Sequence, residues 1–231
     1  MKVIYDDNQI VVVIKPQNIP TQADESGDKD VLSLVKEFVK EKYNKPGEAF
    51  VGLVHRLDRP TGGVLVFARN SKSAGRLSKQ MQDGDIEKTY YAVVKGHLKK
   101  PVARLEHYLV KDHAQNKVSL ATMGQKDARL AVLDYEVLAE KEGLSLVKVR
   151  LETGRSHQIR VQFSAIGNPI YGDGKYGAPD GERQTVNLAL WASGLEFKHP
   201  TLDQTMVFKV NPPEENYPFS LFKDVFKKEF N

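Results

Sequence analysis

Hydrophobic residues along the chain fall into short runs and alternations, separated by turns that contain polar residues, glycine and proline. Such runs are typical of strands, in which successive side chains point to opposite faces. The first two runs flank Asp7-Asn8 and predict a hairpin. Strands are expected over residues 3–5, 10–14, 64–68, 88–94, 104–110, 118–122, 128–138, 144–151, 187–190 and 205–210.

Helical spacing of apolar residues occurs in fewer places. It runs from Val31 to Val39, with Asp30 placed to cap the helix. A second amphipathic stretch opens at Ser71 and continues to about residue 81. A third covers residues 157–166, with Gly167 as its C-terminal stop. A last helix is predicted from three phenylalanines at helical spacing, Phe219, Phe222 and Phe226.

The order of these elements indicates the fold class. Strands outnumber helices and do not alternate regularly with them, which argues against a doubly wound parallel sheet. Several neighbouring strands are joined by short turns, as in antiparallel sheets. The sequence therefore predicts an α+β fold, a mixed, largely antiparallel sheet with packed helices. We see no internal repeat, so we expect one domain over residues 1–231, with a polar surface loop at residues 21–29.

Composition excludes several classes of protein. Hydrophobic residues make up 40% of the chain, which is enough for a packed core. No apolar run approaches the roughly 20 residues of a membrane-spanning helix, and the first residues do not form a signal peptide. There are no cysteines, which excludes disulfides, thiolate zinc sites and cysteine nucleophiles. We therefore expect a cytoplasmic protein that does not contact a membrane.

Positive charge is concentrated in one part of the sequence. The net charge of the chain is +4, from 34 basic and 30 acidic residues, whereas residues 54–80 alone carry 6 − 1 = +5. A basic surface attracts phosphate backbones, but a solvated helix face after a strand would give the same count. The six basic residues are Arg56, Arg59, Arg69, Lys72, Arg76 and Lys79.

The stretch from Val54 to Val66 is the most informative for chemistry. One carboxylate, Asp58, stands between Arg56 and Arg59, and a proline and two glycines then turn the chain into an apolar strand. Nearby positive charge favours an ionised carboxylate. A loop held at a strand end suits a reactive group because the scaffold fixes it. The alternative is an ordinary surface turn in which Asp58 forms a salt bridge.

Two further segments carry groups that suit nucleic-acid binding. Residues 152–160 leave a strand, turn at a glycine and enter a helix, so backbone N–H groups and Arg155 could meet a phosphate. In the strand 88–94, Tyr90 and Tyr91 point to opposite faces, and one ring could stack on a base. A capped helix start with surface arginines, and two tyrosines packed in the core, are the alternatives.

Taken together, these segments resemble the RluA-like family of pseudouridine synthases. That family shows a His-Arg-Leu-Asp loop followed by Thr and a small-Gly pair, a Lys-x-Tyr-x-Ala strand and a Thr-Gly-Arg-x-His-Gln-Ile-Arg segment. Here they stand in that order, at residues 55–63, 88–92 and 153–160. Residues 168–177 and 4–16 also resemble the family's Pro-Ile-x-Gly-Asp loop and its opening segment. The resemblance covers nearly the whole chain.

The resemblance implies an RNA pseudouridine synthase with Asp58 as the catalytic carboxylate. In that reaction the N1–C1′ glycosidic bond breaks, and the uracil turns and rejoins through C5. No redox step occurs, so we expect no cofactor and no metal. By the same resemblance Arg160 pairs with Asp58, Tyr90 stacks on the target base, and Arg56 fills the space that the flipped uridine leaves. The residues expected to contact RNA are Arg56, Arg59, Arg155 and His157.

The sequence departs from the family pattern at two points. Gly62 stands where the family usually has serine, and we expect no loss of function from this change. We expect no small N-terminal RNA-binding domain of the S4 type, which many relatives carry. We therefore expect the catalytic domain itself to recognise the RNA. The predicted partner is a stem-loop of ribosomal or transfer RNA, bound by a monomer.

Other functional classes lack their motifs in this sequence. The six histidines are scattered and include no His-Glu-x-x-His pair. Residues 24–30 lack the glutamate of a calcium loop, because Val35 stands at the twelfth position. There is no Gly-Lys-Ser/Thr after Gly172-x-Gly174 and no Gly-x-Ser-x-Gly elbow. A non-catalytic RNA-binding protein remains as the alternative, although the intact set of predicted catalytic residues argues against it.

Overall fold

The computed structural model describes residues 1–177 and 187–230. The chain forms two compact units, which are described separately below. Unit 1 comprises Met1–Glu87 and Ala192–Val210, and unit 2 comprises Lys88–Trp191 and Asn211–Asn231. The predicted single domain includes residues 178–186 and 231, which lie outside the described residues, and it stays a prediction.

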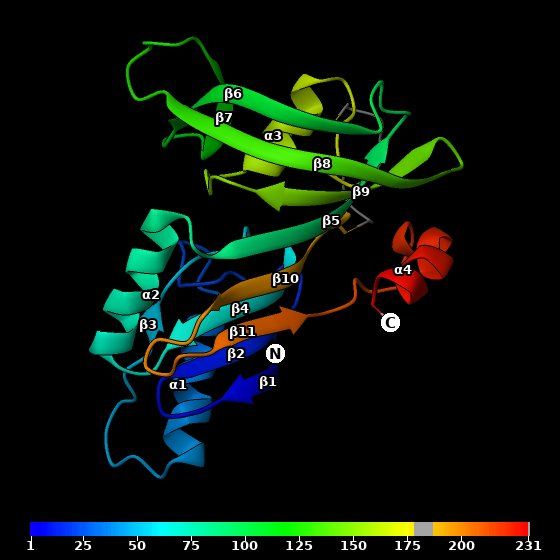
Figure 1. The fold of residues 1–231 in the computed structure, drawn as a ribbon. Coiled ribbons are helices and arrows are strands. Elements are labelled where there is room, and N and C mark those ends of the chain that lie inside the picture. Colours follow the sequence, from blue (N-terminus) through cyan, green and yellow to red (C-terminus); the bar gives the residue numbers. More distant parts are fainter. Residues whose placement is uncertain (178–186, 231) are drawn as a thin grey trace. The chain divides into compact units, whose positions relative to one another are not determined.

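Unit 1 is built on a largely antiparallel group of strands (Figure 1). The order β1-β2-β4-β10 forms its path, with β3 paired to β4 and β11 paired to β10. Every residue of β4 is buried, as expected for a continuous apolar strand that is covered on both faces. The strands are β1 (Lys2–Asp6), β2 (Ile10–Lys15), β3 (Gly52–Leu53), β4 (Gly62–Ala68), β10 (Leu190–Lys198) and β11 (Thr205–Lys209).

Two capped helices belong to unit 1. Helix α1 (Val31–Lys42) begins after Asp30, whose carboxylate accepts from the backbone N–H of Ser33 at 3.0 Å. Helix α2 (Ser71–Asp83) packs against β3 and β4 and is capped in the same way by Asn70. Each cap satisfies a backbone donor that the first turn of a helix leaves unpaired. The predicted cap at Asp30 and the predicted start at Ser71 are both confirmed.

Unit 2 contains a second group of strands in the order β5-β9-β8-β6-β7, in which neighbours pair antiparallel. The hairpin between β8 and β9 turns at Glu142 and Gly143, both with positive φ, as the commonest two-residue hairpin turn requires. The strands are β5 (Glu87–Lys95), β6 (Val102–Asp112), β7 (Lys117–Ala121), β8 (Arg129–Lys141) and β9 (Leu144–Leu151).

Helical segments of unit 2 cover this sheet and close its core. Helix α3 (Gln158–Ala165) packs against β6 and β7 and is followed by Gly167, which has a φ of 85°. The C-terminal segment forms a 3₁₀ turn, η1 (Phe219–Phe222), followed by α4 (Lys223–Glu229). The phenylalanines that predicted this helix are buried at its core, as their spacing indicated.

The α+β fold predicted from the sequence is confirmed. One predicted strand, over residues 187–190, is wrong in position: it overlaps β10 only at Leu190, where β10 begins before running to Lys198. The segment Ala192-Ser193-Gly194 has weak strand propensity, but pairing with neighbouring strands makes it part of β10. The short β3 was not predicted, because two residues carry no periodic signal.

Candidate functional site

The loop that carries Asp58 connects β3 to β4 in unit 1. We call residues 54–61 the Asp58 loop. Its second half is a tight turn, in which the backbone N–H of Thr61 donates to the carbonyl oxygen of Asp58 at 2.9 Å. Gly63 follows with a φ of +124°, and a Cβ atom there would lie 2.2 Å from the carbonyl oxygen of Ala192. Only glycine fits this entry into β4. Asp58 itself is half-buried.

The backbone of the Asp58 loop is held by side chains from the end of β2 and from the segment that follows it. Residues 15–21 donate to three carbonyl oxygens of the loop: Thr21 Oγ1 to Leu57 (2.8 Å), Lys15 Nζ to Arg59 (2.9 Å) and Gln17 Nε2 to Pro60 (3.1 Å). The bonds lie on both sides of Asp58. They fix the backbone from which its carboxylate extends, as a preorganised catalytic group requires.

Lys15 is the most unusual of these donors because it is fully buried. Its ammonium group donates to the carbonyl oxygens of Pro16 and Arg59, both at 2.9 Å. Burial lowers the pKa of Lys15 from 10.5 to about 7, although the negative charge of Asp58 acts in the opposite direction. A lysine is rarely buried without such partners. Lys15 therefore holds the backbone of the Asp58 loop in place through its hydrogen bond to Arg59.

Arg59 is anchored within unit 1. Its guanidinium forms ion pairs with Asp28 and, at 3.5 Å, with Asp24. The same group donates to the hydroxyl of Ser26 at 2.9 Å and to the carbonyl oxygen of Asn18 at 3.2 Å. These carboxylates offset the charge of Arg59, so an RNA phosphate would have to compete with them. The predicted contact of Arg59 with RNA stays a prediction.

The basic residues of the 54–80 stretch do not form one surface. Arg56 and Lys72 are exposed. Arg69 is buried: its guanidinium lies 3.7 Å from the ring centre of Tyr43 and donates to the carbonyl oxygen of Asp7. Arg69 therefore packs the end of the first hairpin. The net charge of +5 counted over residues 54–80 is therefore larger than the positive charge that is available to bind phosphate.

In unit 2, the two tyrosines of β5 take different places. Tyr91 is 3% exposed, its hydroxyl donates to Glu229 at 2.6 Å, and its ring packs edge-on against Phe226. Tyr90 is 7% exposed and lies on the opposite face of the strand. Tyr91 is thus the tyrosine that packs under α4. The stacking role of Tyr90 stays a prediction.

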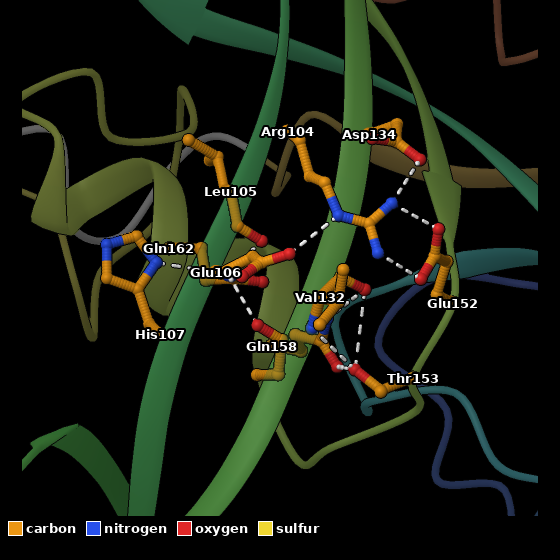
Figure 2. A network of polar contacts seen from close by, with 11 residues as sticks. Arg104, Leu105, Glu106, His107, Val132, Asp134, Glu152, Thr153, Gln158 and Gln162 are labelled. Carbon is orange, nitrogen blue, oxygen red and sulfur yellow. Dashed lines mark hydrogen bonds and ion pairs between the residues drawn. The ribbon is translucent and has the colours of Figure 1, made fainter. Parts of the chain in front are cut away.

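The segment between β9 and α3 is fixed to β8 by one glutamine (Figure 2). The side-chain oxygen of Gln158 accepts from the hydroxyl of Thr153 (2.7 Å) and from the backbone N–H of Arg155 (3.0 Å). Its side-chain nitrogen donates to the carbonyl oxygen of Val132 at 3.0 Å. Val132 also donates its N–H to Thr153 at 2.8 Å. The polar groups of this turn are therefore well satisfied, and the turn is rigid.

This turn presents Arg155 and His157. Arg155 is exposed, and its Nε donates to the carbonyl oxygen of Leu130 at 2.9 Å. His157 adopts a left-handed conformation with a φ of 51° just before α3. Its Nδ1 lies 2.6 Å from the hydroxyl of Tyr176, which also accepts from the N–H of Val118. The imidazole is therefore held in one orientation.

Arg160 extends from α3 and forms a buried ion pair. Its Nε and an Nη donate to the two carboxylate oxygens of Asp173, at 2.8 and 2.7 Å. Burial by itself would raise the pKa of Asp173, but Arg160 and the backbone N–H groups of Lys175 and Tyr176 outweigh it, so the pKa lies below its usual value. This pair fixes the Arg160 guanidinium. The predicted pairing of Arg160 with Asp58 stays a prediction.

Three residues to which sequence reasoning assigned no role prove to be parts of these sites: Lys15, Asp173 and Tyr176. All three lie in segments whose resemblance to the family pattern was noted, residues 4–16 and 168–177, so their positions were a usable signal. Lys88 of β5 belongs with them, because its ammonium group lies beside Gly154 and burial lowers its pKa.

Within residues 1–177 and 187–230, no group of three or more histidine, aspartate or glutamate side chains is placed to hold a metal ion. No helix among them is long and apolar enough to cross a membrane. Unit 1 contains a half-buried carboxylate, that of Asp58, on a fixed loop, and unit 2 contains the buried guanidinium of Arg160 and the exposed one of Arg155. These groups suit acid–base or nucleophilic chemistry on a phosphate-bearing substrate.

Comparison with known proteins agrees with this chemistry. The family model described as RNA pseudouridylate synthase matches residues 9–165. An uncharacterized RNA pseudouridine synthase of Aquifex aeolicus is 34% identical over 93% of the chain and 70% of its own length. The dual-specificity RNA pseudouridine synthase RluA of Yersinia pestis is 33% identical over 90% of this chain and 98% of its own length. The solved structure of human RNA pseudouridylate synthase domain containing 4 shares the fold, with a TM-score of 0.78, 22% identity, and 98% and 93% coverage.

Proposed function

Because the chain belongs to the RNA pseudouridylate synthase family, we propose that Asp58 is the carboxylate with which it isomerises uridines of ribosomal or transfer RNA. Members of this family are isomerases that convert uridine to pseudouridine within RNA.

One observation carries the assignment of Asp58. The carbonyl oxygens on both sides of it, at Leu57 and Arg59, accept hydrogen bonds from Thr21 and Lys15. An ordinary surface turn has no need of a fully buried lysine to hold it. A carboxylate that must meet one atom of a substrate does need a fixed backbone, because small misplacements cost large factors in rate. This bracing favours a catalytic role over a surface salt bridge.

The reaction sets what Asp58 has to do. The N1–C1′ bond breaks, the uracil turns, and C5 forms the new bond to C1′, so no electrons are exchanged with a cofactor. Attack on C1′, addition to C6 of the ring and abstraction of a ribose proton are three routes open to a carboxylate. All three use the ionised form. A half-buried position gives the carboxylate access to substrate while limiting its contact with water.

The target uridine has to leave the RNA stack before this chemistry, because its C1′ and C5 atoms are covered in a stacked helix. In the proposed complex, Tyr90 stacks on the flipped base and Arg56, which is exposed, enters the space that the base vacates. Arg155 and His157 hold phosphates near the start of α3, where backbone N–H groups favour anions. Phosphate contacts of this kind offset the cost of unstacking.

The names of relatives support the choice of RNA. A Borreliella burgdorferi protein named ribosomal large subunit pseudouridine synthase D is 34% identical over 84% of this chain and 60% of its own length. The Yersinia pestis relative is named a dual-specificity enzyme. A stem-loop of ribosomal or transfer RNA is accordingly the proposed substrate. The cytoplasmic location and the monomeric state stay predictions.

The experiment is pseudouridine mapping by carbodiimide treatment and primer extension on total RNA. Cells carrying the wild-type gene, lacking it, or carrying Asp58→Asn are compared. Asparagine keeps the shape of the side chain and removes its charge. Asp85→Asn is the matched control, because it removes an exposed carboxylate from the same unit. We expect at least one ribosomal or transfer RNA site to disappear in the deletion and in Asp58→Asn, and to persist in Asp85→Asn.

The outcomes separate the parts of the proposal. A site that persists in Asp58→Asn would show that another residue performs the chemistry. A site found in a different class of RNA would correct the substrate and leave Asp58 in its role. If RNA from the deletion strain matched the wild type at every position, and the purified protein left ribosomal and transfer RNA transcripts unmodified, the proposed substrates would be wrong.

A further inference from the structure

Unit 2 contains a cavity of about 280 Å³ that the proposed reaction does not use. It lies where β6 and β7 meet the loop before β8 and the turn before α3. We call it the β6–β7 cavity. Its volume is close to that of small-ligand sites, and it is too small for a folded segment of protein.

The floor of the β6–β7 cavity is apolar and rigid. Leu109 and Val118 line it, and each is only 3% exposed. Both belong to a core cluster against which Tyr176 packs. The backbone N–H of Val118 donates to the hydroxyl of Tyr176, which also bonds to His157. The floor is therefore part of the same packed structure as the turn that presents Arg155 and His157.

The rim of the cavity is basic. Lys111, Arg129 and Arg155 line it together with His113, against one acid, Asp127. Three formal positive charges and one negative charge leave a net +2 with the histidine neutral. Strand pairing places the cations over the floor, because Arg129 is the partner of Leu109 and Lys111 is the partner of Val118 across neighbouring strands. The cations thus face one small space.

These cations differ from another arginine of the same sheet. Arg104 of β6 is neutralised by ion pairs with Glu106, Asp134 and Glu152, as Figure 2 shows. Within the described part of the chain, Lys111 and Arg129 form no ion pair with an acid. Arg129 and Arg155 are exposed and Lys111 is half-buried, so their charges are accessible from solvent and attract an anion to the cavity.

We propose that the β6–β7 cavity binds one nucleotide of the substrate RNA other than the target uridine. The ribose or base rests on Leu109 and Val118, and the phosphate meets Lys111, Arg129 and Arg155. The proposal rests on the proposed function, since it assumes that RNA is the substrate. Arg155 connects the cavity with the proposed function, because it lines the cavity and also belongs to the turn that leads into α3. With one carboxylate on its rim, the cavity is unsuited to a metal ion.

The test measures how RNA affinity depends on salt. A fluorescently labelled, transcribed stem-loop with uridines in its loop is titrated with protein at several KCl concentrations. The double variant Lys111→Gln/Arg129→Gln is compared with wild type. We expect it to bind about tenfold more weakly at low salt. The slope of log Kd against log salt should fall by about 1, the change for one lost phosphate contact. The matched control is Lys99→Gln, which removes an exposed lysine between β5 and β6 and should leave the slope unchanged.

A second variant, Asp127→Asn, is expected to increase RNA affinity, so it tests the proposal by a gain of binding. Asp127 has a φ of 62°, which asparagine also tolerates, so Asp127→Asn removes the only acid of the rim without a new backbone constraint. We expect it to bind the same RNA about twofold more tightly. A merely structural role for these residues would not produce a gain.

Failure of this inference can be told apart from failure of the proposed function. Pseudouridine formation by the wild type is measured on ribosomal and transfer RNA transcripts alongside the titrations. If the wild type forms pseudouridine while the double variant keeps the wild-type salt slope and Asp127→Asn binds no tighter, the cavity is not an RNA site. If the variants behave as expected but the wild type modifies neither RNA, the cavity inference stands and the proposed substrates are wrong.

Discussion

The burial of Lys15 makes a quantitative prediction about stability. Its ammonium group is fully buried beneath the Asp58 loop, and this burial lowers its pKa from 10.5 to about 7. Between these two pH values the unfolded chain keeps the proton on Lys15 and the folded protein releases it. Folding is therefore penalised by the buried charge below about pH 7, and this penalty is relieved as the pH rises toward 10.5.

The size of the effect follows from proton linkage. One proton fewer in the folded state raises the free energy of unfolding by about 1.4 kcal/mol for each pH unit. Replacing Lys15 by methionine removes the titrating group while keeping a long apolar side chain. From about pH 7.5 to about pH 9.5, the free energy of unfolding of the wild type should therefore rise by about 2–3 kcal/mol relative to Lys15→Met. Taking the difference between the two proteins cancels all other titrating groups.

Urea unfolding followed by far-ultraviolet circular dichroism at the two pH values measures this difference. Lys40→Met is the control, because it removes an exposed lysine from α1 of the same unit. The free energy of unfolding of Lys40→Met should differ from that of the wild type by the same amount at both pH values. If the Lys15→Met difference is also constant, within about 0.5 kcal/mol, the lysine keeps its proton in the folded protein. The burial argument for Lys15 would then be wrong.

Three further substitutions test the packing of the two sites. Gly63→Ala should lower the free energy of unfolding by about 3 kcal/mol or more, because its Cβ would overlap the backbone of β10; Gly75→Ala in α2, where nothing lies within 4 Å, is the matched control. Arg160→Gln should lower the free energy of unfolding by about 3–5 kcal/mol, since it leaves Asp173 buried without its ion partner. A smaller decrease in chemical denaturation would show that water reaches that carboxylate. Tyr91→Phe should cost about 1 kcal/mol, because the Glu229 carboxylate of α4 loses one of its donors and keeps Lys148; an unchanged thermal midpoint would contradict this.

Local patterns explain why much of the fold was predictable. Asp30 caps α1 through a bond to Ser33, three residues away. The β8–β9 hairpin turns at two residues with positive φ. The alternation of Tyr90 and Tyr91 follows from strand geometry alone. Interactions of this kind depend on neighbours in the sequence, so hydrophobic periodicity and capping residues are enough to infer them.

Other features depend on residues that are distant in the sequence. Lys15 donates to a carbonyl oxygen 44 residues away, and its burial could not be inferred from Lys15-Pro16. Arg69 belongs by sequence to a basic stretch, but the ring of Tyr43 makes it part of the core. Strand β10 extends through residues of weak strand propensity, because pairing with its neighbours outweighs that preference.

The sequence by itself thus determined the α+β class, most of the elements, and the family to which the motifs point. The tertiary structure alone decided how the Asp58 loop is braced, which acid holds Arg160 within unit 2, and which cations surround the β6–β7 cavity. The physical reason is that burial and charge pairing are properties of space. A lysine or arginine has the same local pattern whether solvent, a carbonyl oxygen or a carboxylate surrounds it, and only the folded chain determines which of these it meets.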